Sequence, residues 1–178
     1  MNATINDILT RRSVRTFQRR QIDRDILSTV LEAGLSAPSA HGKRPVRLAV
    51  LEDESVRKRI ASVMTWFQPV VKAPAAILVL GDPTVCTQRD YWVVDCAAST
   101  ENILVAARSL SLGTVWCGIS PVADNVEAIR SVLDIPAPLV PFAAIAIGYP
   151  VKDDVFKEVT LDTSKYVYWN PAWDKQAK

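Results

Sequence analysis

The densest cluster of functional groups lies near the amino terminus, where residues 11–15 read Arg-Arg-Ser-Val-Arg. Guanidinium groups bind phosphate oxygens through paired hydrogen bonds, and a serine hydroxyl adds a further donor. Three guanidinium groups within five residues therefore predict a phosphate-binding site. The alternatives are a solvated basic surface or, together with Arg19 and Arg20, a weak nucleic-acid contact.

Two glycine-containing segments are suited to a close approach between the main chain and a flat ligand. Residues 37–45 read Ala-Pro-Ser-Ala-His-Gly-Lys-Arg-Pro and include His41, the only histidine of the sequence. Residues 113–121 read Gly-Thr-Val-Trp-Cys-Gly-Ile-Ser-Pro. Small residues let a backbone lie directly against a ring system. The purely structural alternatives are a helix-to-strand connection for the first segment and core packing by Trp116 and Cys117 for the second.

Several other kinds of site lack their signature. The sequence has no GxGxxG, GxxxxGK[ST] or GxSxG pattern, which mark Rossmann, P-loop and serine-hydrolase sites. The three cysteines, Cys86, Cys96 and Cys117, form no CxxC pair, so neither a structural zinc site nor a disulfide framework is expected. Asp95 and Glu101 are carboxylates within a long apolar segment, where a buried acid commonly pairs with a neighbour.

Length and composition place these groups in one globular domain. The chain has 178 residues, of which 49% are hydrophobic and 22% charged, which excludes disordered, collagen-like and coiled-coil classes. A formal net charge of +2 predicts no extended surface for nucleic acid or membrane. No run reaches the roughly 18 apolar residues of a membrane helix, and the amino terminus lacks a signal-peptide pattern. We therefore predict a cytoplasmic protein.

Apolar periodicity predicts an alternation of helices and strands that positions the two segments. Helices are expected around residues 5–9, after Asp23, and over 53–64, 91–112 and 124–133; strands are expected over 46–51, 75–80 and 142–148, with 114–117 a short strand or turn. The helix over 91–112 carries apolar residues on both faces, which predicts burial at the centre of the molecule. Gly113 is expected to cap its carboxyl end.

The last part of the chain has a different character. Residues 151–178 are polar and show no clean period, yet they include Tyr166, Tyr168, Trp169 and Trp173. Aromatic residues in such a segment favour wrapping around another surface over fraying. The chain therefore divides into a domain over 1–150 and a tail over 151–178.

Several segments together, in order and spacing, resemble the FMN-dependent nitroreductase family. They are residues 11–17, 37–40, 91–98, 101–104, 112–119 and 145–150 and, more loosely, 168–173. The resemblance implies an α+β fold in which helices flank a central mixed β-sheet. It also implies an intertwined homodimer, in which the tail wraps the partner subunit and FMN lies at the interface.

The same resemblance implies a set of cofactor contacts. The arginine-rich segment would hold the FMN phosphate and ribityl chain, the first glycine-containing segment would approach the ring from the other subunit, and the second would cover the opposite side with an N–H near flavin N5. A basic tail residue, Lys157 or else Lys152, would join the phosphate. The implied residues are Arg11, Arg12, Ser13, Arg15, Pro38, Ser39, Ala40, Gly42, Cys117, Gly118, Ile119 and Lys157. No side chain is assigned as catalytic, because a flavin itself performs the redox steps.

The implied activity is a ping-pong cycle in which NAD(P)H delivers hydride to flavin N5 and an electron-poor acceptor, such as a nitroaromatic or a quinone, then takes the electrons. Many relatives carry Asn, Gln and Trp where this chain has Gly42, Arg44 and Val46. That variant resembles flavin domains linked to deazaflavin-cofactor biosynthesis. The alternatives are therefore a specialised flavin enzyme for an anionic biosynthetic substrate, favoured by Lys43 and Arg44, and a non-catalytic flavin-binding protein.

Overall fold

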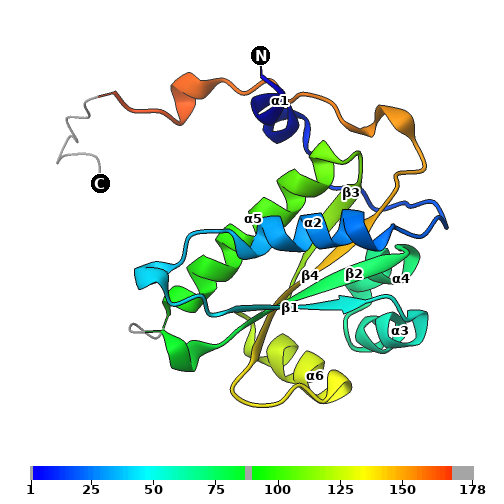
Figure 1. The fold of residues 1–178 in the computed structure, drawn as a ribbon, viewed down its shortest axis with the longest axis vertical. Coiled ribbons are helices and arrows are strands. Elements are labelled where there is room, and N and C mark those ends of the chain that lie inside the picture. The colour runs from blue at the N-terminus through cyan, green and yellow to red at the C-terminus, as the bar shows by residue number, and fades with distance from the viewer. Residues whose placement is uncertain (1, 87–89, 170–178) are drawn as a thin grey trace.

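A four-stranded β-sheet forms the centre of the molecule (Figure 1). A computed structural model of the chain describes residues 2–86 and 90–169. The strands lie in the order β1-β2-β4-β3, so that β1 and β3 are the edges. Their bounds are Val46–Leu51 for β1, Ala75–Gly81 for β2, Gly113–Gly118 for β3 and Val140–Gly148 for β4.

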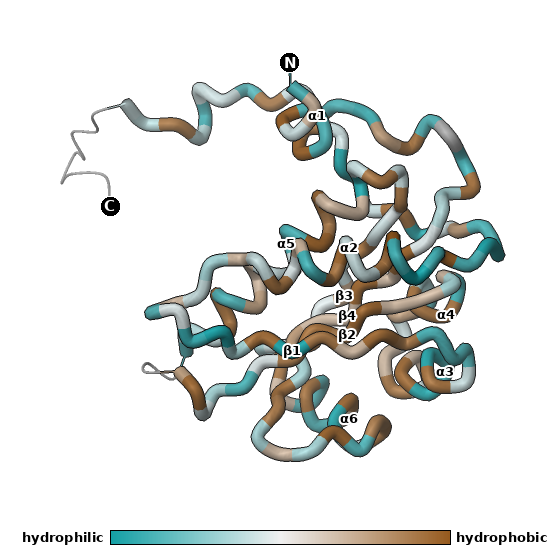
Figure 2. Tube along the Cα trace, viewed as in Figure 1, coloured by the Kyte–Doolittle hydropathy of each residue, from teal (hydrophilic) through white to brown (hydrophobic). Residues whose placement is uncertain are grey.

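The three strand pairings are all antiparallel. The sheet is therefore antiparallel where a mixed sheet was expected, and the parallel pairing seen among the described residues is an isolated bridge between Ser13 and Thr114, at the β3 edge. The central strands β2 and β4 are uniformly apolar because helices cover both of their faces. Every residue of β2 is buried, and Figure 2 shows the hydrophobic residues concentrated on the central strands.

Helices cover the sheet in two layers. The helices α2 and α5 pack on one face of the sheet, while α3, α4 and α6 pack on the other. The first helix, α1, lies apart from the sheet and contacts α5 (Figure 1). The helix bounds are Ala3–Thr10 for α1, Arg24–Leu35 for α2, Glu54–Val63 for α3, Gln68–Lys72 for α4, Tyr91–Ser109 for α5 and Ala123–Leu133 for α6. The family-type α+β fold with a helix-flanked sheet is thus the observed one.

Two sequence-based expectations differ from the structure at the end of α5. The helix ends at Ser109, and Ser111 rather than Gly113 takes the left-handed conformation, with φ 59°. Gly113 is instead the first residue of β3. A Cβ at Gly113 would lie 2.7 Å from Cβ of Val14, so this glycine allows the amino-terminal segment to pack against the strand. The short helix α4 was not predicted, because Pro69 reads as a helix breaker although it is tolerated in the first turn.

In the isolated chain, the helix α5 has one buried side and one more accessible side. Its inward side chains include Cys96, Ile103 and Leu104, which are nearly inaccessible. Its outward side carries Tyr91 and Val94, whose residues are 42% and 61% exposed. The helix therefore presents an apolar stripe on the surface of the isolated chain.

The tail leaves the body of the protein after β4. It passes α1 and then extends away from the domain (Figure 1). Trp169 is 87% exposed and Tyr166 is 73% exposed, so these aromatic rings gain little burial within the chain. Trp173, which also suggested a wrapping tail, lies outside the described residues.

Candidate functional site

The arginine-rich segment follows α1 and runs along the edge of β3. The N–H of Val14 donates to the carbonyl of Thr114 at 2.8 Å, and Val14 is buried. Because successive side chains of an extended segment point to opposite sides, burying Val14 turns its neighbours Ser13 and Arg15 outward. Both neighbours are exposed. The sheet thus presents the polar groups of this segment at its β3 edge.

The guanidinium groups of this segment retain unused hydrogen-bond donors. Arg11 Nε lies 3.4 Å from Glu101 Oε1 on α5, and Arg15 Nη1 donates to the carbonyl of Ser13 at 3.3 Å. Arg12 Nη1 donates to the carbonyl of Arg11, whereas Arg12 Nη2 is buried with no hydrogen-bond partner in the part of the chain that the structure describes. A buried donor without an acceptor is costly, and a phosphate oxygen is the acceptor that suits a guanidinium best. These residues therefore fit the phosphate of a cofactor such as FMN.

The carboxyl end of β3 offers an accessible stretch of main chain. Cys117 and Ile119 are buried, while Gly118 between them is exposed. A Cβ placed on Gly118 would meet no atom within 4 Å. Trp116, two residues earlier, faces the same side and is 37% exposed. The arrangement fits a flat ring system lying over the backbone of the strand.

Cys117 does not have the surroundings of a nucleophile. Burial raises the pKa of the Cys117 thiol to about 11, and the Arg15 guanidinium acts in the opposite direction. The thiol is therefore neutral at physiological pH. The arginine-rich segment runs along the same strand, because Ser13 forms a bridge with Thr114, three residues before Cys117.

The loop at residues 38–42 has a defined conformation. Ser39 Oγ accepts a hydrogen bond from the N–H of Arg44 at 3.0 Å, which closes the loop, and the N–H of Ala40 donates to Asp95 Oδ1 at 3.0 Å. His41, Gly42 and Arg44 all have positive φ, of 53°, 66° and 49°. His41 is exposed. The turn exposes the backbone around Gly42, where a Cβ would meet nothing within 4 Å.

The loop and the arginine-rich segment contact different turns of α5. The loop bonds to Asp95, whereas Arg11 lies against Glu101 and Thr10 against Arg108. Six residues of helix separate Asp95 from Glu101, which is about 9 Å along the helix axis. Within a single chain, residues 11–15 therefore lie near residues 117–119 at the β3 edge. Residues 38–42 lie further along α5, away from both segments.

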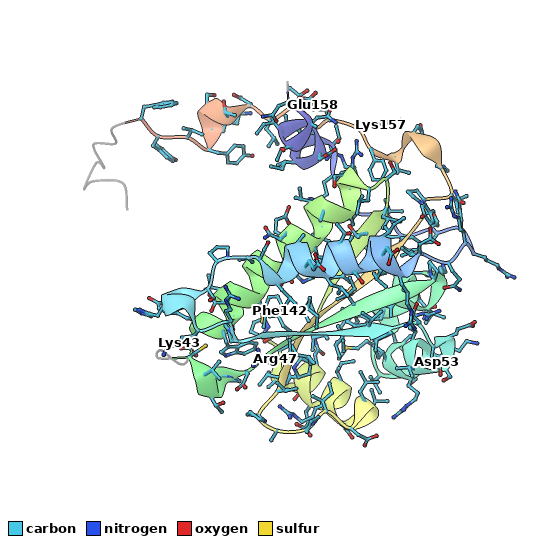
Figure 3. All side chains as sticks on the ribbon, in the orientation of Figure 1. Lys43, Arg47, Asp53, Phe142, Lys157 and Glu158 are labelled. Atoms are coloured by element: carbon cyan, nitrogen blue, oxygen red, sulfur yellow. The ribbon has the colours of Figure 1, made fainter. Side chains whose placement is uncertain are left out.

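Lys157 lies on the tail where it passes α1 (Figure 3). Its Nζ is 2.9 Å from Asp154 Oδ2, and both side chains are well exposed. The neighbouring Phe156 ring lies under the guanidinium of Arg108 at 4.3 Å, and Arg108 Nε donates to Thr10 Oγ1 at 3.0 Å. This chain of contacts holds Lys157 near the end of α1. The alternative, Lys152, lines a separate hollow of about 290 Å³ with Gln18, Ser111, Tyr149, Pro150 and Phe156.

Sequence reasoning did not assign a role to Arg108. Besides its bond to Thr10, its Nη1 lies 3.6 Å from Asp7 Oδ1, and both side chains are largely buried. The sequence signal was the one basic residue of α5, but its partners lie on α1 and in the tail, far away in sequence. Only the packing of α1 against α5 identifies the contact.

Two further classes of site find no support in the described residues. Across residues 2–86 and 90–169, no group of three or more His, Cys, Asp or Glu side chains is arranged to hold a metal ion. No helix in the same ranges is long and apolar enough to cross a membrane.

Comparison with known proteins adds an independent line of information. The model of the Nitroreductase family matches residues 8–92 and 87–149. A protein of Archaeoglobus fulgidus, provisionally named NADH dehydrogenase/NAD(P)H nitroreductase, is 38% identical over 159 residues, covering 89% of this chain and 91% of its own length.

Two solved structures show the same fold. One, from Parabacteroides distasonis and provisionally named NADH dehydrogenase/NAD(P)H nitroreductase, superposes with a TM-score of 0.88 at 29% identity and covers 96% of this chain and 99% of its own. The other is a provisionally named nitroreductase from Desulfovibrio desulfuricans in complex with FMN. It has a TM-score of 0.83 at 26% identity and covers 96% of this chain and 98% of its own.

Proposed function

Because this chain belongs to the nitroreductase family, we propose that it is an FMN-dependent oxidoreductase that moves electrons from NAD(P)H to an electron-poor acceptor such as a nitroaromatic or a quinone. The names of its relatives support the NAD(P)H dependence, and the FMN complex of one structural neighbour supports the cofactor. FMN, when bound, supplies the two-electron redox chemistry. NAD(P)H and the acceptor would use the site in turn, in a ping-pong cycle.

The buried Nη2 of Arg12 is the observation that carries this proposal, because it lacks an acceptor that a phosphate would supply. Arg11, Arg12 and Ser13 would hold the phosphate and the ribityl chain through charge-assisted hydrogen bonds. Lys157, held near the end of α1, would add a second source of positive charge.

Arg15 and the end of β3 would orient the ring system. Arg15 follows the bridge between Ser13 and Thr114 at the β3 edge, and a cation there would stabilise negative charge that develops on a neighbouring group during reduction. The exposed backbone of Gly118, between Cys117 and Ile119, would lie against the ring with an N–H donor. These residues act by binding and orientation, so no side chain is needed as an acid or base.

The remaining contacts would come from a second copy of the chain. Pro38, Ser39, Ala40 and Gly42 lie along α5 from the arginine-rich segment, so a homodimer packed through α5 would bring one chain's loop to the other chain's arginines. The exposed stripe at Tyr91 and Val94 supports such a contact. In this arrangement residues 1–150 form the FMN-binding domain, and the tail over 151–178 wraps the partner subunit.

One observation favours a second candidate function. Lys43 and Arg44 are exposed next to the loop, and Arg44 forms no ion pair among the described residues. This positive charge favours an anionic biosynthetic substrate as the electron acceptor. A third possibility, a flavin-binding protein without turnover, differs in its response to NAD(P)H.

The decisive test is the visible absorption spectrum of the purified protein, before and after anaerobic NADPH and then NADH. We expect flavin bands that bleach with at least one reductant. Bands that do not bleach would indicate a flavin carrier, and a protein that takes up no FMN would contradict the proposal. Oxidation of the bleached protein by menadione, a nitrobenzoate or a panel of anionic metabolites then separates the two candidate acceptor classes.

The phosphate assignment has its own test. Arg11→Ala and Ser13→Ala should each weaken FMN binding by about 1–3 kcal/mol, because each removes a charge-assisted contact. Equilibrium titration of FMN fluorescence measures the loss. Lys58→Ala, which removes only an exposed ion pair with Glu54 on α3, is the control and should leave FMN affinity unchanged. Full flavin affinity in both site variants would show that the phosphate binds elsewhere.

A further inference from the structure

A cavity of about 490 Å³ lies behind the loop at residues 38–42, between α2, β1 and α5. Its lining residues are Leu31, Gly34, Leu35, Ala37, Pro38, Ser39, Arg44, Val46, Arg47, Leu48 and Asp95. Sites for small molecules typically have volumes of roughly 300–1,000 Å³, a mostly apolar lining and a few polar groups that converge on the ligand. This cavity has all three properties.

The apolar part of the cavity comes from two elements. Leu31 and Leu35 project from α2, while Val46 and Leu48 project from β1, an edge strand of the sheet. Leu35 is 50% exposed, so the apolar surface continues to the opening of the cavity. A ligand with an apolar body would cover this surface and exclude water from it.

Two arginines, Arg44 and Arg47, are among the lining residues, and both are exposed. Arg47 belongs to β1 (Figure 3), and its side chain leaves the strand between those of Val46 and Leu48, on the opposite face. Its Nη1 donates to the carbonyls of Arg44 and Val46, both at 2.9 Å. These bonds hold the guanidinium near the start of the strand. Within the described ranges, neither Arg44 nor Arg47 forms an ion pair with a carboxylate, so the positive charge of each remains unpaired there.

Asp95 supplies a buried acceptor to the wall formed by α5. It is 5% exposed, and its Oδ1 accepts the N–H of Ala40. Its Oδ2 is buried and has no hydrogen-bond partner in the described part of the chain. The same is true of Ser99 Oγ, which lies one turn further along α5, beside Gly34. An unsatisfied buried carboxylate oxygen requires a donor, and a ligand carrying an O–H or N–H group would provide it.

We propose that this cavity is a binding site for a small organic acid, separate from the proposed flavin site. The ligand has an apolar body about the size of two fused rings, an acidic group that pairs with Arg44 and Arg47, and an O–H or N–H donor at its other end that bonds to Asp95. Pro38 and Ser39 form part of both the cavity wall and the proposed flavin contact.

The test is calorimetric titration of the FMN-loaded protein with 6-hydroxy-2-naphthoate, which has the acid, the apolar body and the donor. We expect 2-naphthoate, which lacks the donor, and 2-naphthol, which lacks the acid, each to bind about tenfold more weakly, because each forfeits one polar contact. The same titrations on flavin-free protein should give similar affinities, which makes the result independent of the proposed function.

Two variants locate the site. Arg47→Gln should weaken the two naphthoates about tenfold and leave 2-naphthol unchanged, because only the acids use the charge. Val46→Trp places a large side chain in the cavity and should abolish binding of all three probes, while thermal unfolding checks that the variant is folded. Arg20→Gln is the control, since Arg20 lies over the Tyr149 ring and outside the cavity.

The proposal is contradicted by several outcomes. The first is equal probe affinity in the wild type and in a folded Val46→Trp variant. The second is an Arg47→Gln variant that loses as much affinity for 2-naphthol as for the naphthoates. The third is probe binding that disappears when FMN is removed. The last result would place the probe at the flavin. Failure to bind any of the three probes in the wild type also overturns the proposal, even if the protein is an active flavoenzyme.

Discussion

Two glycines of the sheet illustrate how one residue type serves packing at one position and binding at another. A Cβ on Gly81 would lie 2.2 Å from the Trp92 ring, so this glycine is required for α5 to pack on β2. A Cβ on Gly118 would meet no protein atom within 4 Å, so packing within the chain does not require glycine there. The space beside Gly118 is explained if a ligand lies against the backbone.

This contrast leads to a prediction for Gly118→Ala. The variant should have a free energy of unfolding within about 1 kcal/mol of the wild type, because the added methyl group meets open space. It should nevertheless bind FMN about tenfold more weakly, because the methyl group enters the space proposed for the ring. Urea unfolding of the flavin-free protein and FMN titration measure the two quantities.

Gly81→Ala is the matched control for that prediction. Its added methyl group overlaps the buried Trp92, so it should destabilise the fold by roughly 1–3 kcal/mol. Unchanged FMN affinity in Gly118→Ala would show that the flavin does not approach this part of β3.

At the level of elements, α5 organises the site through residues spaced along its length. Asp95 holds the loop at residues 38–42, Glu101 faces Arg11, and Arg108 binds the end of α1. Arg108 also stacks on Phe156, so one side chain connects α5, α1 and the tail. Because the arginine-rich segment begins directly after α1, the position of α1 determines where those guanidinium groups lie.

Arg108 is therefore predicted to be a positioning residue for cofactor binding. Arg108→Ala should lower the free energy of unfolding by about 1–3 kcal/mol, since it leaves the largely buried Asp7 without its ion-pair partner and removes the donor to Thr10 Oγ1. It should also weaken FMN binding about fivefold to tenfold, because α1 no longer has a fixed orientation. Arg108→Lys retains the charge but not the planar group, and should recover only part of both losses.

Urea unfolding measures the change in the free energy of unfolding, and titration of FMN fluorescence measures the change in FMN affinity. Lys58→Ala again serves as the control, since its exposed ion pair contributes little to stability. If Arg108→Ala lost stability and kept full FMN affinity, Arg108 would have a structural role alone.

At the scale of the whole molecule, exposed apolar groups occur on two parts of the isolated chain. The outward stripe of α5 contains Tyr91 and Val94, and the tail carries Tyr166 and Trp169. Large exposed aromatic residues in a segment that extends from the body gain burial only by contact with another surface. A second copy of the chain provides that surface in the proposed homodimer.

Deleting residues 151–178 should consequently weaken the dimer. We expect the dissociation constant measured by sedimentation to rise at least about tenfold, because the tail's aromatic contacts with the partner are lost. FMN affinity should fall as well, since Lys157 is removed. A chain that lacks only residues 170–178 is the comparison, and separates the contribution of the last nine residues from that of the segment carrying Phe156 and Lys157. A dimer of unchanged affinity after the full deletion would show that the tail does not wrap the partner.

Local patterns in the sequence were sufficient for most of the fold. The strand over 46–51 has the predicted bounds, and the helix predicted after Asp23 begins at Arg24. Periodicity identifies such elements because burial of one face imposes a repeat of 2 or 3.6 residues on the sequence itself. The end of α5 was placed incorrectly, because Gly113 is glycine for its contact with Val14, a residue about a hundred positions away.

The sequence by itself determined the kinds of group available, namely the guanidinium cluster over 11–15, the loop over 38–42 and the segment over 117–119, because residue type and local turn chemistry are properties of short segments. The tertiary structure decided how they are arranged. It placed the arginine-rich segment against Thr114 of β3, held the loop at Asp95, and formed the cavity lined by Arg47. These relations depend on where parts of the chain that are distant in sequence meet across the sheet and along α5. A local sequence pattern does not specify such long-range contacts.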